Sequence, residues 1–119
     1  MPAGMSRYLS MLDSLPIPRL APHPDLHVEG GSTSSSGSDG WGGDATAQGR
    51  LSVGEATRHY AEQLEAQGWT ADELAGDGTA LAVQAFRRTF NGKSWWATLT
   101  VAQPTGSTNL ILSFRLRAI

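Results

Sequence analysis

The sequence contains no cysteine, and this absence excludes disulfide bonds, thiol catalysis and thiolate metal sites. It has no run of roughly 18 apolar residues, the length that a membrane-spanning helix needs. Nor does an apolar run of signal-peptide length follow basic residues near the N-terminus. We therefore expect a soluble or peripheral protein, and 119 residues allow one domain at most.

Acidic residues are missing from the last third of the chain. All eleven carboxylates lie between Asp13 and Asp77, and the first 79 residues hold only four arginines to oppose them. Residues 80–119 carry no acid and five bases: Arg87, Arg88, Lys93, Arg115 and Arg117. Such a separation of charge along a chain indicates contacts with other molecules rather than a particular chemistry.

The common catalytic and phosphate-binding motifs are also absent. No serine stands in the Gly-x-Ser-x-Gly context of a nucleophile elbow, and there is no Gly-x-x-x-x-Gly-Lys-Ser/Thr loop. His23, Asp25 and His27 alternate, so in an extended chain they could point one way and bind a divalent metal. Prolines beside them favour an exposed coil instead, and we expect neither a metal nor another cofactor.

Three side chains of a predicted helix have a spacing that suits acid–base chemistry. Glu55, His59 and Glu62 lie at positions i, i+4 and i+7, which places them on one side of a helix. The same spacing describes a solvated helix face, and nothing in the sequence indicates that these groups are buried. We therefore expect a protein that is not an enzyme.

The first 24 residues read as an N-terminal arm. Apolar residues between positions 5 and 15 follow helical periodicity, which predicts a short amphipathic helix. Pro16 ends it, and three further prolines up to Pro24 hold the following segment extended. A helix of about 11 residues is marginal alone in water, so its apolar face needs a surface to lie on.

Residues 25–119 are expected to form a single domain that begins with a Gly/Ser-rich hairpin. Glycine, serine and threonine fill all but two positions between 30 and 43, a composition typical of flexible linkers. The flanking residues alternate between apolar and polar, which predicts strands near 25–32 and 40–51. Small side chains there would let another element approach closely.

A well-marked helix follows the hairpin. Ser52 and Glu55 form a capping box, and Gly68 can take the left-handed position that ends a helix in a Schellman motif. Its apolar stripe is narrow and consists of Ala56, Tyr60, Ala61 and Leu64.

The last forty residues predict an antiparallel meander of three strands. Asn91-Gly92 is a strong hairpin signal between strands at 81–90 and 95–101, and a turn at 103–106 precedes a strand at 110–117. A change of phase in the first of these strands predicts a bulge near Ala85. The sequence thus predicts a two-layer α+β fold, a sheet of about five strands (β-β-α-β-β-β) with one packed helix, preceded by the extended arm.

We infer from the arm that the protein is a non-catalytic accessory subunit. It would dock on a larger protein assembly, potentially a membrane-associated one with which it makes peripheral contact, and would bridge to a second component. The predicted contact residues are Met5, Tyr8, Leu9, Leu12, Leu15, Pro16 and Pro18 of the arm, and Trp41, Trp96, Arg115 and Arg117 of the domain.

Two other binding functions remain open. In one, the domain binds a small ligand or a cell-envelope component in an aromatic cleft near Tyr60, Trp69 and Trp95. In the other, the five bases of residues 80–119 bind nucleic acid and Trp96 stacks on a base. The acidity of the whole chain opposes the second alternative.

Overall fold

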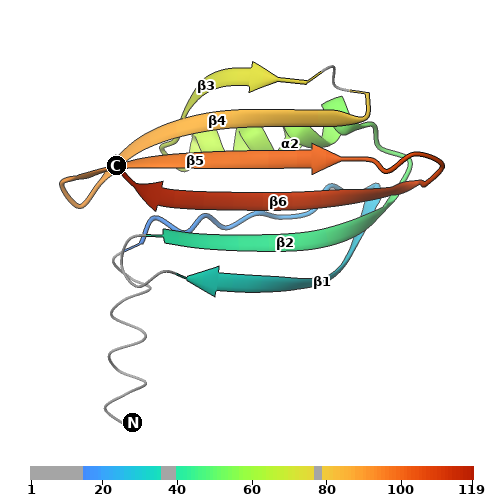
Figure 1. Ribbon diagram of the computed structural model, residues 1–119, viewed down its shortest axis with the longest axis horizontal. Coiled ribbons are helices and arrows are strands. Elements are labelled where there is room, and N and C mark those ends of the chain that lie inside the picture. Colours follow the sequence, from blue (N-terminus) through green and yellow to red (C-terminus); the bar gives the residue numbers. More distant parts are fainter. Residues whose placement is uncertain (1–14, 36–39, 77–78) are drawn as a thin grey trace, which may run out of the picture.

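The protein is an α+β domain in which one helix packs on one face of an antiparallel sheet, as the sequence predicts (Figure 1). The computed structural model describes residues 15–35, 40–76 and 79–119. Its elements are β1 (Leu26–Ser35), β2 (Gly40–Gly49), α2 (Val53–Ala66), β3 (Thr70–Ala75), β4 (Leu81–Phe90), β5 (Lys93–Ala102) and β6 (Asn109–Ala118). The helix predicted for residues 5–15 lies, except for Leu15, outside the described residues.

The sheet has six strands, in the order β1-β2-β6-β5-β4-β3, and all neighbours are antiparallel. The prediction of about five strands is therefore wrong by one. The additional strand is β3, which lies at one edge, and all six of its residues are exposed. Its sequence does not alternate between apolar and polar residues because neither of its faces is buried. Main-chain pairing with β4, and not burial of an apolar face, keeps β3 in the sheet.

The predicted bulge near Ala85 is also wrong. Strand β4 pairs with β5 in an unbroken register from Leu81 to Phe90. The irregularity lies instead in β3, between Ala71 and Leu74. There the buried amide of Gln84 donates hydrogen bonds to the carbonyl oxygens of Asp72 (2.9 Å) and Glu73 (3.1 Å) and satisfies the main chain that leaves the ladder.

Helix α2 begins and ends where the sequence predicts. The Ser52 hydroxyl accepts a hydrogen bond from the Glu55 main-chain N–H at 3.1 Å and donates to the Glu55 carboxylate at 2.9 Å. At the other end Gly68 has a φ of 102°, and Trp69 N–H donates to Leu64 O at 3.0 Å, as in a Schellman motif. These caps fix the rotation of α2 and direct its buried stripe at the sheet.

Two predicted turns join the strands of the meander. Asn91 and Gly92 both have positive φ values, 51° and 76°, which a two-residue hairpin of this type requires. The second turn closes with a hydrogen bond from Ser107 N–H to Pro104 O at 3.0 Å.

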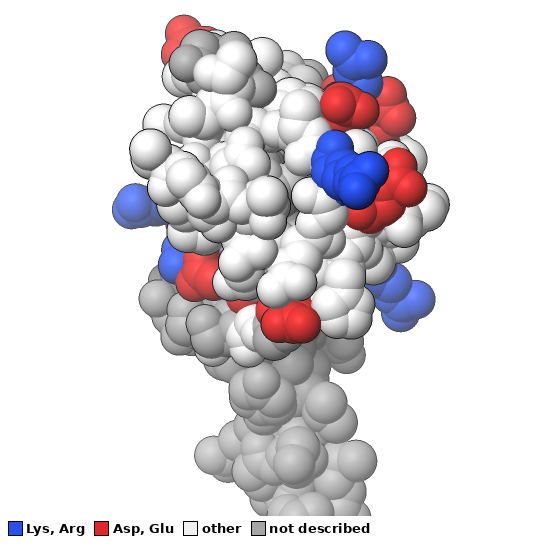
Figure 2. Space-filling view, turned by 90° about the vertical axis from the view of Figure 1, so that its right-hand side faces the viewer, with Lys and Arg blue, Asp and Glu red and all other residues white. Residues whose placement is uncertain are grey.

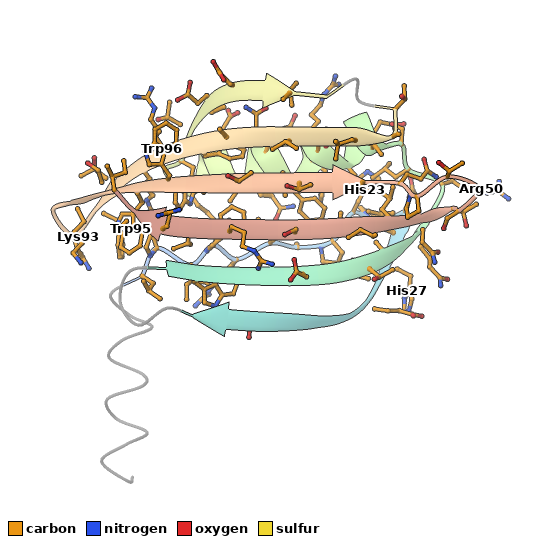
Figure 3. The ribbon with its side chains drawn as sticks, in the orientation of Figure 1. His23, His27, Arg50, Lys93, Trp95 and Trp96 are labelled. Carbon is orange, nitrogen blue, oxygen red and sulfur yellow. The ribbon has the colours of Figure 1, made fainter. Side chains whose placement is uncertain are left out.

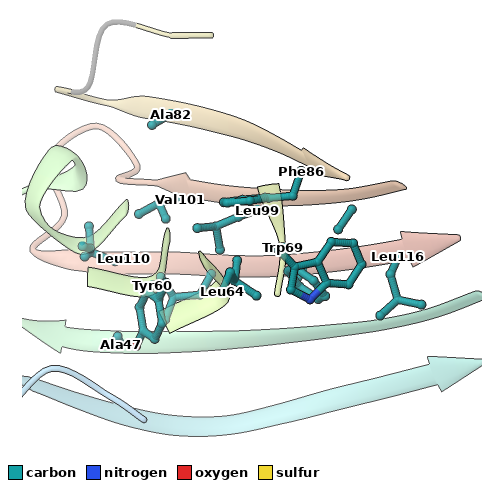
Figure 4. Packing of buried hydrophobic residues seen from close by; sticks show 14 of the residues in the cluster. Ala47, Tyr60, Leu64, Trp69, Ala82, Phe86, Leu99, Val101, Leu110 and Leu116 are labelled. Atoms are coloured by element: carbon teal, nitrogen blue, oxygen red, sulfur yellow. The ribbon is translucent and has the colours of Figure 1, made fainter. Parts of the chain in front are cut away.

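The sheet has one covered and one open face. We call the face under α2 the inner face and the opposite one the outer face. Helix α2 packs over β3, β4 and β5. Between the two layers, Leu64 of α2 and Phe86, Trp95 and Leu99 of the sheet are buried with almost no exposed surface, and Figure 4 shows such side chains packed in this layer. No helix in the described part of the chain is both long and apolar enough to cross a membrane.

Candidate functional site

Residues 15–24, which we call the strap, run along the inner face on the same side of the sheet as α2 (Figure 1). Leu15 is only 4% exposed and belongs to the core, while Ile17 and Leu20 pack against it. From the sequence, this segment is expected to belong to an arm outside the core, with Leu15 as a partner contact. The described end of that arm instead covers the chain's own sheet, because α2 covers only the β3–β5 half.

Two glutamines of α2 hold the main chain of the strap. The Gln67 amide accepts from Arg19 N–H at 2.8 Å and donates to Arg19 O at 2.7 Å. One helical turn earlier, Gln63 accepts from Ala21 N–H at 2.7 Å and donates to Ala21 O at 2.8 Å. We call these four hydrogen bonds the glutamine ladder. Because both glutamines bind main-chain groups of the strap, they fix its course without contacting its side chains.

Histidines extend the ladder by one further turn. The ring of His23 lies edge-on against the ring of His59, with centroids 5.0 Å apart. His59 Nε2 is 2.9 Å from Ala21 O and 2.8 Å from Gln63 Nε2. It donates to the carbonyl in one tautomer and accepts from the Gln63 amide in the other.

A cleft of about 310 Å³ lies between the strap, α2 and the β1–β2 part of the inner face. Its lining is mainly apolar, and it comes from segments far apart in the sequence. The lining residues are Pro18, Leu20 and Pro22 of the strap, Tyr60 of α2, and Val28, Gly31, Thr33, Trp41, Gly43, Asp44, Ala45, Leu99, Leu112, Ser113 and Phe114 of the sheet. This volume is at the lower end of the range for small-ligand sites.

The cleft exists because this part of the sheet is built from small residues. Thr33 and Gly43 face each other across β1 and β2 on the inner face, and Ala45 follows two residues later. A Cβ atom at Gly43 would lie 3.2 Å from the Trp41 ring, so glycine leaves room for that indole. The sequence predicts that small side chains in the Gly/Ser hairpin let another element approach closely, but here they border the open cleft, and the strap forms its opposite wall.

Tyr60 is the most enclosed polar residue of the cleft wall. It is 5% exposed, and its ring lies edge-on to His59 with centroids 5.0 Å apart. Burial raises the pKa of the Tyr60 hydroxyl above its ordinary value of 10.0, so the group keeps its proton at neutral pH. Within the described residues this hydroxyl has no hydrogen-bond partner.

The aromatic residues of the cleft differ from those that the sequence analysis names. Of its three candidates only Tyr60 lines the cleft, since Trp69 and Trp95 belong to the core. Trp41 and Phe114 take their places, with ring centroids 6.4 Å apart. Phe114 also contacts Trp69 at 6.1 Å and so separates the filled part of the inner face from the cleft.

The candidate metal and acid–base groups serve other roles. His27 lies 3.4 Å from Glu29, whereas the His23 ring accepts a hydrogen bond from Asp25 N–H and packs on His59. Glu55 belongs to the helix cap. Across the described ranges no group of three or more histidines and carboxylates could hold a metal ion.

Trp96 stands on the outer face, 41% exposed. The strand register places Arg87 directly opposite it on β4 and Arg117 opposite it on β6. Arg115 lies on the same face, two residues before Arg117. The structure thus brings together three of the predicted contact residues, at the end of the sheet that lies away from His23 and His27 (Figure 3). Of the contact residues predicted on the arm, Met5, Tyr8, Leu9 and Leu12 lie outside the described residues, Pro16 is buried, and Pro18 lines the cleft.

The basic residues do not form one positive patch. Arg87 pairs with Asp72 and Arg115 with Asp44, each at 2.9 Å. The guanidinium of Arg88 lies over the Phe90 ring, with Cζ 4.9 Å from the centroid. At the end of the molecule that carries the β5–β6 turn, acidic and basic side chains are neighbours (Figure 2). Two ion pairs therefore join the basic last third of the chain to its acidic part.

Sequence reasoning missed Gln63 and Gln67, the residues that hold the strap. Their spacing of four residues places both on one side of α2, and this was the available signal. It was insufficient because a pair of glutamines on a helix is equally typical of a solvated surface.

A comparison of the chain with protein-family models, with curated proteins and with solved structures found no match.

Proposed function

We propose that the protein is a non-catalytic binding domain that takes a small, largely apolar ligand in the cleft beneath the strap. The observation that carries this proposal is the space of about 310 Å³ that the chain's own side chains leave between an apolar sheet face and an apolar strap. Well-packed cores have few voids larger than a water molecule, so a space of this size favours a ligand over imperfect packing.

The nature of the lining restricts the ligand. Among the described residues, no lysine, arginine or histidine lines the cleft. The one acidic residue is Asp44, whose carboxylate pairs with Arg115 on the outer face. A charged ligand would lose its hydration there without gaining a counter-ion, so the cleft favours an uncharged molecule of roughly ten to twenty non-hydrogen atoms.

Nuclear magnetic resonance titration with an uncharged two-ring probe, 2-ethylnaphthalene, tests the proposal. We expect saturable shifts of main-chain amide signals around Thr33, Gly43 and Tyr60. Leu20→Phe places a ring in the cleft and should remove these shifts. Leu74→Phe adds the same group at a site that is 61% exposed on β3, and it should leave them unchanged. Shifts that fail to saturate, or that survive in Leu20→Phe, would contradict the proposal.

Trp96 supports a second function, docking on a protein assembly through the outer face. An exposed tryptophan with arginines on both sides is typical of the centre of a protein interface. Trp96→Ala should then abolish co-purification of partner subunits from the native host, while Ile111→Ala, which removes another exposed apolar side chain of this face, should not. Retention of the same partners by Trp96→Ala would rule this function out.

A further inference from the structure

The polar groups around the cleft differ in whether they are already bound. Asp44 is already bound, since Arg115 Nη2 lies 2.9 Å from its carboxylate. Thr33 is exposed on β1, where water can reach its hydroxyl. Tyr60 alone combines burial with a hydroxyl that no described residue contacts by a hydrogen bond.

The Tyr60 side chain is only 5% exposed, yet its hydroxyl is not among the fully buried polar atoms that lack a partner, so it keeps contact with open space and can bind a ligand. Tyr60 is also positioned firmly. Its Cα lies in the middle of a capped helix, and its ring is held between the sheet and His59. A phenolic O–H is a better donor than acceptor, since its lone pairs are partly delocalised into the ring. The group is therefore ready to donate to an acceptor that enters the cleft.

We propose that the Tyr60 hydroxyl is the recognition group of the cleft and that the ligand carries one hydrogen-bond acceptor, such as a ketone or ester carbonyl, on an otherwise apolar one- or two-ring body. This inference rests on the proposed binding function and adds the chemical class of the ligand. Leu20, Trp41 and Phe114 supply the apolar contacts, while Tyr60 fixes the orientation.

A matched pair of probes tests the inference on the full chain. 2-Acetylnaphthalene and 2-ethylnaphthalene have nearly the same shape and differ in a carbonyl oxygen. We expect the wild-type protein to bind the ketone about 2- to 10-fold more tightly, the usual net contribution of one hydrogen bond. Tyr60→Phe should remove this preference, so that the ratio of the two dissociation constants falls to about one.

The carbonyl stretching frequency of the bound ketone gives a second measurement that needs no variant. In the wild-type protein it should lie below the frequency of 2-acetylnaphthalene in hexane, as donation from Tyr60 weakens the C=O bond. In Tyr60→Phe it should return to the hexane value.

The outcomes separate this inference from the function on which it rests. Binding of both probes with equal affinity, or a carbonyl frequency equal to that in hexane, would overturn the role of Tyr60 and leave the binding function standing. A ketone preference that persists in Tyr60→Phe would do the same. Failure of both probes to bind the wild-type protein would overturn the binding function and the inference together.

Discussion

The two halves of the inner sheet face are covered in different ways. Over β4 and β5 the side chains of α2 pack closely against those of the sheet, and Leu64, Phe86 and Trp95 have almost no exposed surface. Over β1 and β2 the cover is the strap, whose main chain is fastened to α2 while its side chains leave a cleft. We call these the helix half and the strap half. The contrast teaches that a cleft can form beside a well-packed core when the segment that covers the sheet is held by its main chain.

Replacement of one leucine in each half by alanine should give the largest difference in stability between the two halves. Leu64→Ala in the helix half should lower the free energy of unfolding by about 3–4 kcal/mol, because a fully buried leucine leaves a cavity. Leu20→Ala in the strap half should cost about 1 kcal/mol or less, since its side chain already borders open space. Urea denaturation measures both values. Equal losses would show that the strap half is packed as tightly as the helix half.

Removal of the glutamine ladder should release the strap. Gln63→Ala combined with Gln67→Ala deletes four hydrogen bonds and should lower the free energy of unfolding by about 2–3 kcal/mol. Trypsin should then cleave after Arg19 faster, as mass spectrometry of the fragments would show. The control is Glu62→Ala with Glu65→Ala, which changes two exposed residues of the same helix. An unchanged cleavage rate would mean that the ladder does not hold the strap.

Enlargement of a side chain should raise the free energy of unfolding in the strap half and lower it in the helix half. Leu20→Phe should raise the free energy of unfolding by about 0.5–1 kcal/mol, because the added ring buries apolar surface in the cleft. Val101→Phe in the helix half should lower it by about 1–3 kcal/mol, since Val101 has no exposed surface and no room to expand. Thermal or urea unfolding of the two variants decides the matter, and destabilisation by both would argue against an accessible cleft.

The smallest of these four predicted effects is that of acid, which should destabilise the strap half before the helix half. A hydrogen bond from Ser113, and then the Arg115 guanidinium, hold the pKa of Asp44 below its ordinary value of 3.8. A lowered pKa in the folded state means that the link between β2 and β6 stabilises above about pH 4 and is lost as the pH falls further. The protection factors of the β1 and β2 amides, which correct the exchange rates for the intrinsic effect of pH, should therefore fall below pH 4 before those of β4 and β5. Asp44→Asn should remove the difference; if it persists there, another group is responsible.

The sequence predicts elements well where a local signal and a buried face coincide. The caps of α2, the Asn91-Gly92 hairpin and the alternation in β5 and β6 belong to this class. Strand β3 was missed because its pairing with β4 leaves no trace in its own composition. A cleft near Tyr60 is predicted from the sequence, but its other walls are not. It depends on contacts between residues 42 to 48 positions apart, Arg19 with Gln67 and Ala21 with Gln63, which no local pattern specifies.

The glutamine ladder also sets a rule for how the strap can vary between related chains. Gln63 and Gln67 need the N–H groups of residues 19 and 21, which every amino acid except proline provides. The four prolines of the strap stand at positions 16, 18, 22 and 24, none of which donates to the ladder. Substitutions at positions 18, 20 and 22 could therefore reshape the pocket for a new ligand while the fastening stays intact. In this fold, residues that line the cleft and residues that fasten the strap to α2 alternate along one short segment.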